Sequence, residues 1–332
     1  MTVLVTGGAG YIGGHMVLAL LDAGEKVVVL DDLSTGFRWA VRPPATLIVG
    51  DVGDVGLVDR IIAEHRIDAI AHFAAKIVVP DSVTEPLLYY LNNTAKARSL
   101  FDCAVRGKVK HFIFSSTAAV YGETTTDLIS ETAPLAPINP YGRSKLMSEW
   151  MLQDVSNAHG LKLAILRYFN VAGADPKGRL GQSGSRATHL IKIAAQTAIG
   201  LRSYLEVFGT DYPTRDGTCI RDYIQVSDLA DAHVLALNYL RNGGANLICN
   251  CGYGHGLSVF EVVDAMKKVS GVDFEVRISG RRPGDSVSLA AGTERIKSVL
   301  GWKPKWDDLI AIVSQALEWE KSLRAKSDSR HS

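Results

Sequence analysis

Short apolar runs alternate with longer amphipathic segments through the first half of the chain. The runs are rich in Val, Ile and Leu and cover residues 3–6, 26–31, 46–51, 68–75, 110–116 and 161–167. Short, nearly continuous apolar runs are typical of strands that are buried on both faces. Their alternation with helix-length segments predicts an α/β fold with a Rossmann-type doubly wound parallel sheet.

Helices are expected between these runs, over residues 12–23, 55–65, 86–105 and 141–156. After about Asn170 the rhythm loosens into Gly- and Arg-rich stretches with shorter elements, which predicts a smaller α/β lobe. We therefore expect two parts, residues 1–170 and residues 171–332. The helix-and-strand pattern of about residues 222–250 repeats the earlier rhythm, so this segment is expected to return to the first part.

A glycine-rich loop joins the first predicted strand to the first predicted helix. The sequence VLVTGGAGYIGGH places Gly7, Gly10 and Gly13 there. Bare backbone lets a pyrophosphate approach the helix N-terminus, where unpaired N–H groups favour negative charge. Asp31 closes the second run, and its carboxylate can accept both ribose hydroxyls, whereas a 2′-phosphate would be repelled by Asp31 and Asp32. The pattern predicts a site for NAD rather than NADP.

A second group of polar residues follows the fifth run. Ser115 and Thr117 end that run, and Tyr141 and Lys145 stand four apart on one helix face. A tyrosine with a pKa of about 10 needs about 4 kcal/mol of phenolate stabilisation to act as a base near pH 7. An ammonium about 4 Å away supplies about that much at an effective dielectric near 20, and the positive nicotinamide ring of NAD+ would add to it. We therefore expect Thr117, Tyr141 and Lys145 to be catalytic. The same sequence would also fit a threonine that caps its own turn and two ordinary residues on a helix.

The motifs also carry a family resemblance. TGGAGYIG, FIFSSTAAVYG, PYGRSKLMSE, FGTDYPTRDGTCIRDYIQVSDLADAH, NCGYGHGLSV and RRPGDS occur in this order along the chain. The sequence resembles the extended short-chain dehydrogenase/reductase superfamily and, within it, the UDP-glucose 4-epimerases over nearly its whole length. The resemblance implies that UDP-galactose and UDP-glucose are interconverted through a 4-keto sugar, with transient hydride transfer to tightly bound NAD. Tyr141 would take the proton of the sugar 4-hydroxyl while Thr117 holds that oxygen.

The same resemblance implies a set of binding residues. The NAD site would contain Gly7, Gly10, Tyr11, Ile12, Gly13, Asp31, Asp32, Asp51, Val52, Phe73, Ala74, Ala75, Asn93, Ser115, Tyr141, Lys145, Tyr168 and Phe169. The UDP-sugar site, largely in the second lobe, would contain Thr117, Tyr141, Asn170, His189, Leu190, Glu206, Val207, Phe208, Arg221, Arg282, Asp285 and Leu289. Within it, Arg221 and Arg282 would hold the pyrophosphate and Asp285 the uridine ribose, while Phe208 would line the uracil pocket.

The chain departs from the family pattern at four places. Thr117 stands where a serine is frequent, and its hydroxyl is expected to serve equally well. Ile77 stands where a lysine is usual, with Lys76 one place early, and His189 stands where an asparagine is common. Leu289 aligns with a position that can bear a tyrosine near the sugar, so N-acetylated sugars are a possible alternative. UDP-xylose/arabinose and UDP-glucuronate 4-epimerases are further alternatives, as is a non-catalytic NAD-binding regulator. A sugar 4,6-dehydratase is disfavoured because Ala118 and Ala119 follow Thr117 and cannot transfer protons.

The amino-acid composition limits the kinds of binding partner that we expect. The 36 basic side chains nearly cancel the 35 acidic ones, so no general field attracts nucleic acid or anionic lipid. No apolar run is long enough to span a membrane. The four cysteines form no CxxC pair, which argues against a metal site or a disulfide framework and fits reduced thiols in the cytoplasm. A homodimer is expected by resemblance.

Overall fold

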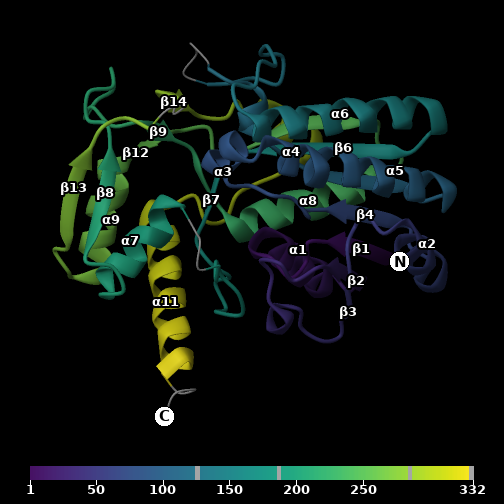
Figure 1. The fold of residues 1–332 in the computed structure, drawn as a ribbon, viewed down its shortest axis with the longest axis horizontal. Helices are drawn as coiled ribbons and strands as arrows, with labels where there is room; N and C mark the ends of the chain where they lie inside the picture. Colours follow the sequence, from purple (N-terminus) through teal and green to yellow (C-terminus); the bar gives the residue numbers. More distant parts are fainter. Residues whose placement is uncertain (124–127, 185–187, 283–285, 329–332) are drawn as a thin grey trace.

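The computed structural model describes residues 1–332 except 124–127, 185–187, 283–285 and 329–332. Two lobes lie side by side (Figure 1). The larger holds a seven-stranded sheet with helices on both faces, and the smaller holds short sheets packed with helices α7, α9 and α11. Within the described part of the chain, no helix is both long enough and apolar enough to cross a bilayer.

The large sheet is parallel throughout, with the strand order β11-β6-β5-β4-β1-β2-β3. The order runs outward in both directions from β1 and β4, and such a switch point opens a crevice at the carboxyl ends of the strands. This confirms the predicted Rossmann-type α/β fold. The strands are β1 (Thr2–Thr6), β2 (Lys26–Asp31), β3 (Thr46–Val49), β4 (Ala69–His72), β5 (His111–Thr117), β6 (Lys162–Tyr168) and β11 (Leu247–Cys251).

Alternate side chains of each strand enter two separate cores. Val3 and Val5 of β1 point to one core, whereas Leu4 points to the other. Helices α1 (Tyr11–Asp22) and α8 (Val226–Arg241) cover the first face, and α2 (Val55–His65), α5 (Lys96–Arg106) and α6 (Pro140–His159) cover the second. Both faces of the sheet are therefore buried, which is why these strands read as continuous apolar runs.

Helix α6 begins where the sequence places an Asn-Pro pair. Asn139 is the N-cap, and its side chain accepts a hydrogen bond from the Gly142 N–H at 2.9 Å. Pro140 fits the first helical position because its missing N–H would have no helical partner there. The helix ends at Gly160, which adopts a left-handed conformation with φ 71°.

The helix expected over residues 86–105 is not regular. After α3 (Val79–Thr84) the chain forms α4 (Pro86–Tyr89), a π-helical turn η2 (Tyr90–Ala95) and then α5. Asn93 lies in the π-helical turn, is 2% exposed, and exchanges two hydrogen bonds with the Lys76 backbone. The wider turn thus carries a buried polar side chain, as π-helical insertions often do near functional sites.

The smaller lobe is built from short ladders. Parallel β8 (Tyr204–Phe208) and β13 (Glu275–Ser279) form one, and β9 (Ile220–Arg221), β12 (Leu257–Ser258) and β14 (Ser288–Leu289) form another. Strands β7 (Asn170–Ala172) and β10 (Tyr223–Gln225) pair between the lobes. The remaining elements are α7 (Leu190–Ala198), α9 (Val259–Ser270), α10 (Glu294–Leu300), α11 (Leu309–Asp328) and the short turns η1 (Arg38–Ala40) and η3 (Ala118–Val120).

Candidate active site

The glycine loop forms a cradle that only glycine can build. Gly7 has φ +72°, and a Cβ there would lie 2.6 Å from the Ala74 backbone nitrogen. A Cβ on Gly13 would lie 2.2 Å from the Gly7 carbonyl oxygen, so α1 packs directly against the loop. Gly10 caps α1 without any side-chain hydrogen bond, which leaves the first-turn N–H groups of Tyr11 and its neighbours facing the loop. The cradle therefore suits an anion at the helix N-terminus.

The end of β2 places a carboxylate beside this cradle. Asp31 is 7% exposed and accepts hydrogen bonds from the Ala9 N–H at 2.9 Å and the Leu33 N–H at 2.8 Å. Burial raises the pKa of Asp31, and these two backbone hydrogen bonds lower it. The effect of burial is larger, so the pKa lies above its usual value. Asp32 is exposed and accepts from Ser34 within its own turn. Asp31 is thus the better placed of the two to receive ribose hydroxyls.

Other predicted cofactor residues follow the neighbouring strands at the same edge of the sheet. Asp51 and Val52 come after β3, and Asp51 pairs with Lys96 at 2.5 Å. Phe73, Ala74 and Ala75 come after β4, and the Phe73 ring lies 5.0 Å from the ring of buried His233. Ile12 lies in the first turn of α1, and Phe169 links β6 to β7. Asn93 lies on the π-helical turn, where its side chain is hydrogen-bonded to the Lys76 backbone and to the Ser144 hydroxyl. These bonds hold the loop after β4 in place.

The structure brings the three expected catalytic side chains together between α6 and the end of β5. The Lys145 ammonium donates to the Ser115 carbonyl oxygen at 2.8 Å and lies 5.0 Å from the centre of the Phe114 ring. The Thr117 hydroxyl acts on the Tyr141 phenol and lowers its pKa. Tyr141 is 9% exposed and Lys145 is 2% exposed. The arrangement is a buried phenol with a hydroxyl partner and a nearby cation.

The charge of Lys145 does not by itself bring the pKa of Tyr141 below its ordinary value, and the joint effect of Lys145 and a nicotinamide stays a prediction. Burial raises the pKa of Tyr141 to about 12, with the Thr117 hydrogen bond acting in the opposite sense, and burial lowers the pKa of Lys145 to about 8. The physical reason is that the lysine donates to the Ser115 carbonyl, while both groups lose their hydration. Further positive charge beside the phenol is needed to offset this cost.

The Ser115 hydroxyl at the end of β5 also has a hydrogen-bond partner. The Ser115 side chain is hydrogen-bonded to the Tyr168 hydroxyl, and burial raises the pKa of Tyr168 above its ordinary range. The Tyr168 ring also packs edge-on against His233, 5.9 Å between ring centres. Ser115 and Tyr168 therefore form the neutral wall behind the catalytic pair.

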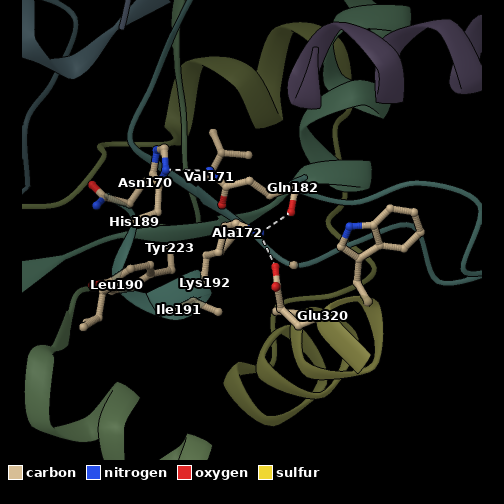
Figure 2. Close-up of a pocket in the computed structure, with 13 residues that line it drawn as sticks. Asn170, Val171, Ala172, Gln182, His189, Leu190, Ile191, Lys192, Tyr223 and Glu320 are labelled. Carbon is tan, nitrogen blue, oxygen red and sulfur yellow. Dashed lines mark hydrogen bonds and ion pairs between the residues drawn. The ribbon is translucent and has the colours of Figure 1, made fainter. Parts of the chain in front are cut away.

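A pocket in the smaller lobe contains several predicted substrate residues. Asn170, His189 and Leu190 line it together with Tyr223 and a buried pair, Lys192 and Glu320 (Figure 2). The Gln182 amide is hydrogen-bonded to Nδ1 of His189 at 2.6 Å, and burial lowers the pKa of His189. With Nδ1 accepting from Gln182, the Nε2–H of His189 is left as a donor. His189 can therefore donate one hydrogen bond, as an asparagine amide would.

The residues expected at the nucleotide end fall into two groups. Arg282 lies over the Phe208 ring, with its guanidinium carbon 3.7 Å from the ring centre. Arg221 is 8% exposed and donates to the carbonyl oxygens of Ile220 and Ser286 at 2.8 Å each. The two arginines lie in different parts of the lobe: Arg282 follows β13, whereas Arg221 belongs to β9.

The side chains of three predicted substrate residues, Glu206, Val207 and Leu289, contact other parts of the protein. Val207 is 1% exposed within the core, and Glu206 is exposed and binds the Ser279 hydroxyl, so Val207 can offer a ligand only its backbone. Leu289 pairs in register with Arg221 and packs against the cluster that contains Phe169. Asp285 lies outside the described residues.

The sequence reasoning missed Glu149, which lies at the same site. Glu149 is fully buried on α6, and its carboxylate accepts from Ser116 and from Arg167. The available signal was its spacing, because Tyr141, Lys145 and Glu149 follow one another at intervals of four residues on one helix face.

The fold and these groups define a dinucleotide-binding α/β protein with a buried tyrosine-lysine pair. The family described as the NAD dependent epimerase/dehydratase family matches residues 3–252, and the chain belongs to this family. A protein of Azospirillum brasilense named UDP-glucose 4-epimerase is 57% identical over 97% of this chain and 92% of its own length.

Two solved structures are also similar. The UDP-glucose 4-epimerase of Brucella ovis, in complex with NAD, superposes with a TM-score of 0.93 at 42% identity over 96% of this chain and 97% of its own. The UDP-Glc/GlcNAc 4-epimerase of Campylobacter jejuni has a TM-score of 0.85 at 48% identity, over 97% and 99% of the two chains.

Proposed function

We propose that this protein is an NAD-dependent isomerase that interconverts UDP-galactose and UDP-glucose by inverting carbon 4 of the sugar. The observation that carries the proposal is the burial of Tyr141 and Lys145 on one helix against Ser115 and Thr117, at the sheet edge that also holds the glycine cradle. Membership of the NAD dependent epimerase/dehydratase family supports it, as do relatives named UDP-glucose 4-epimerase along nearly the whole chain.

The residues of the cradle fit NAD. Gly7 and Gly13 occupy positions that a Cβ would fill, and Asp31 presents a carboxylate at the end of β2. When bound, the oxidised nicotinamide supplies a hydride acceptor and a positive charge. Thr117 and the wall formed by Ser115 and Tyr168 would then face the reacting end of the site, while Asp31 would hold the adenosine ribose.

The chain's own groups perform the proton transfer. The Tyr141 phenolate oxygen would take the proton of the sugar 4-hydroxyl, while the Thr117 hydroxyl fixes that oxygen by a hydrogen bond. Lys145 would favour the phenolate by its charge from a position held by the Ser115 carbonyl. The 4-keto sugar then has to turn over while its nucleotide stays held, so most of the affinity must come from the UDP end. Arg221, Arg282 and Phe208 supply suitable contacts there.

The proposal is tested by purifying the protein without added cofactor. The bound nucleotide is released by denaturation and identified, and the native protein is assayed for conversion of UDP-galactose to UDP-glucose. We expect NAD in the released fraction and conversion without a net change in redox state. No conversion even after NAD is supplied would overturn the epimerase proposal and would favour a non-catalytic NAD-binding protein.

A second candidate activity is epimerisation of N-acetylated UDP-sugars. Leu289 is only partly buried beside Phe169, and its side chain is smaller than the tyrosine that can occupy this position. The similar C. jejuni structure is titled a UDP-Glc/GlcNAc 4-epimerase. A panel that adds UDP-N-acetylglucosamine and a UDP-pentose to UDP-glucose separates these substrates. Turnover of UDP-glucose without UDP-N-acetylglucosamine would exclude the wider specificity.

We further propose that the protein is a cytoplasmic homodimer. Helices α4 and α6 with the turn η2 expose apolar side chains beside a groove lined by Tyr90, Leu91, Met147 and Met151, and Leu91 is 52% exposed. Such a patch is typical of protein interfaces. Cys103, Cys249 and Cys251 are buried free thiols, which fits a reducing compartment. Light scattering tests the assembly, and Leu91→Glu is expected to yield monomers while the wild type is dimeric.

A further inference from the structure

Three side chains of α6 interact with three consecutive residues of β5. The Lys145 ammonium donates to the Ser115 carbonyl, Glu149 accepts from the Ser116 hydroxyl at 2.5 Å, and the Thr117 hydroxyl lowers the pKa of Tyr141. The helical spacing of four residues thus matches the end of one strand. Of these three side chains, only Glu149 has no proposed part in the reaction. Without Glu149, α6 would contact the end of β5 here only through Tyr141 and Lys145.

Glu149 is itself held by a row of polar residues that runs across three strands. Ser116 of β5 is in register with Arg167 of β6, and Arg167 is in register with Asn250 of β11. The guanidinium of Arg167 donates to both carboxylate oxygens of Glu149, at distances between 2.5 and 3.2 Å. Ion pairs buried this deeply cost desolvation energy, so their retention calls for a specific role.

The row ends in a fully hydrogen-bonded network. Arg167 also donates to the Tyr121 hydroxyl at 3.1 Å, and that hydroxyl donates to the Asn250 side chain at 2.7 Å. The Asn250 amide then donates to the Ile129 carbonyl at 2.7 Å. Because every member has partners, Glu149 has a defined position and its carboxylate stays fixed relative to β5.

Few charged or titratable groups face Lys145 from the elements around it. On its own helix these are Tyr141 and Glu149. His72 of β4 is neutral at physiological pH because burial and the charge of Lys145 lower its pKa to about 3. From β6, burial keeps Tyr168 protonated, and Arg167 points to Glu149. Glu149 is the anion of this set, and its charge opposes the effect of burial on Lys145.

We propose that Glu149 is a positioning residue that holds α6 in register with β5 and keeps Lys145 charged and directed at the end of that strand. This inference rests on the proposed function, because it assigns Lys145 a role in stabilising the Tyr141 phenolate. Glu149 would act only through Lys145 and would not touch the sugar or the cofactor.

The test uses the full-length protein and three variants. Glu149→Gln removes the charge and keeps the size, while Glu149→Gln combined with Arg167→Met removes both charges and the cost of an unpaired one. Asp68→Asn is the control, because Asp68 forms a partly buried bidentate pair with Arg241 at the opposite end of the sheet. The measurements are the thermal midpoint, the pH dependence of kcat with NAD supplied, and the ultraviolet phenolate titration read as a difference from Tyr141→Phe.

Both Glu149 variants are expected to lose kcat by about tenfold or more and to shift the alkaline limb of the profile down by about one pH unit. The Tyr141 phenolate is expected to form at higher pH in both, and the control is expected to change none of these. A double variant with the wild-type midpoint, pH profile and phenolate titration would overturn the inference, and so would a double variant that does not fold. The phenolate titration needs no substrate, so it is decided separately from the proposed activity.

Discussion

The two lobes hold their functional side chains by different means. In the larger lobe, Lys145 and Asp31 are buried and bind backbone groups at the ends of strands in a seven-stranded sheet. In the smaller lobe, three arginines stack on aromatic rings in or beside the ladder of β8 and β13: Arg282 on Phe208, Arg281 on Tyr212 and Arg277 on Tyr204, at 3.7, 4.1 and 3.8 Å. Backbone partners on a continuous sheet fix a group in space, whereas stacked side chains can rearrange around a ligand.

This difference matches the proposed division of labour. Proton transfer requires donors and acceptors held within a narrow range of distances, so a rigid sheet edge suits it. A sugar that turns over while its nucleotide stays bound requires a grip that closes on the nucleotide and leaves the sugar free. The following experiments sharpen or break this comparison.

The largest effect is expected from Tyr141→Phe. The variant loses the proton acceptor, so kcat should fall by about 10³-fold or more while folding is retained. Steady-state kinetics and circular dichroism measure the two properties. Tyr239→Phe, which removes a surface hydroxyl bonded to the Ala245 N–H, is the control and should be active. Near-normal turnover by Tyr141→Phe would refute its role as the base.

Gly13→Ala should release NAD. The added Cβ would lie 2.2 Å from the Gly7 carbonyl oxygen, so the loop or the start of α1 must move, at a cost of about 1–3 kcal/mol. NAD retained after purification and the thermal midpoint should both fall. Gly56→Ala on α2 meets only ordinary contacts and should be neutral or slightly stabilising. Full NAD retention by Gly13→Ala would show that the cradle is not the cofactor site.

Arg282→Ala should act on substrate binding and leave the chemistry intact. Losing one charge-assisted contact to the pyrophosphate should raise KM by about 10- to 100-fold with little change in kcat. Arg277→Ala removes a similar stack from the same ladder and should leave KM unchanged. If Arg282→Ala lowered kcat as strongly as Tyr141→Phe does, the two lobes would not divide binding from chemistry.

Acid should destabilise the protein through buried histidines at the sheet. Burial lowers the pKa of His15 and His233 to about 4 and that of His72 to about 3, from an ordinary value of 6.5. Between pH 6.5 and these values the unfolded chain binds more protons, so stability falls as the pH falls. Each histidine contributes up to about 1.4 kcal/mol per pH unit in that window.

Urea unfolding at several pH values measures this dependence. His233→Gln should flatten it, because one of the buried histidines no longer contributes, whereas His159→Gln at the exposed end of α6 should leave the slope unchanged. A slope that stays the same in His233→Gln would contradict the assignment of His233 as a neutral buried group.

Prediction from sequence worked best where local pattern and tertiary structure agree. The strands of the large sheet and the helix expected over residues 141–156 were predicted from the sequence, because each depends on residues close together in the chain. The regular helix over residues 86–105 was wrong because the π-helical turn depends on Asn93 meeting Lys76, a contact that no local pattern contains.

The sheet, the glycine cradle and the candidate trio Thr117, Tyr141 and Lys145 follow from the amino-acid sequence, because strand periodicity, bare backbone and helical spacing are local properties. The electrostatics of that trio depend on how the chain folds. The raised pKa of Tyr141 follows from burial, and the charge of Lys145 responds to Glu149 and through it to Arg167, which lies on another strand. Burial and partners distant in the chain set a pKa, and both arise only when α6 packs against the sheet.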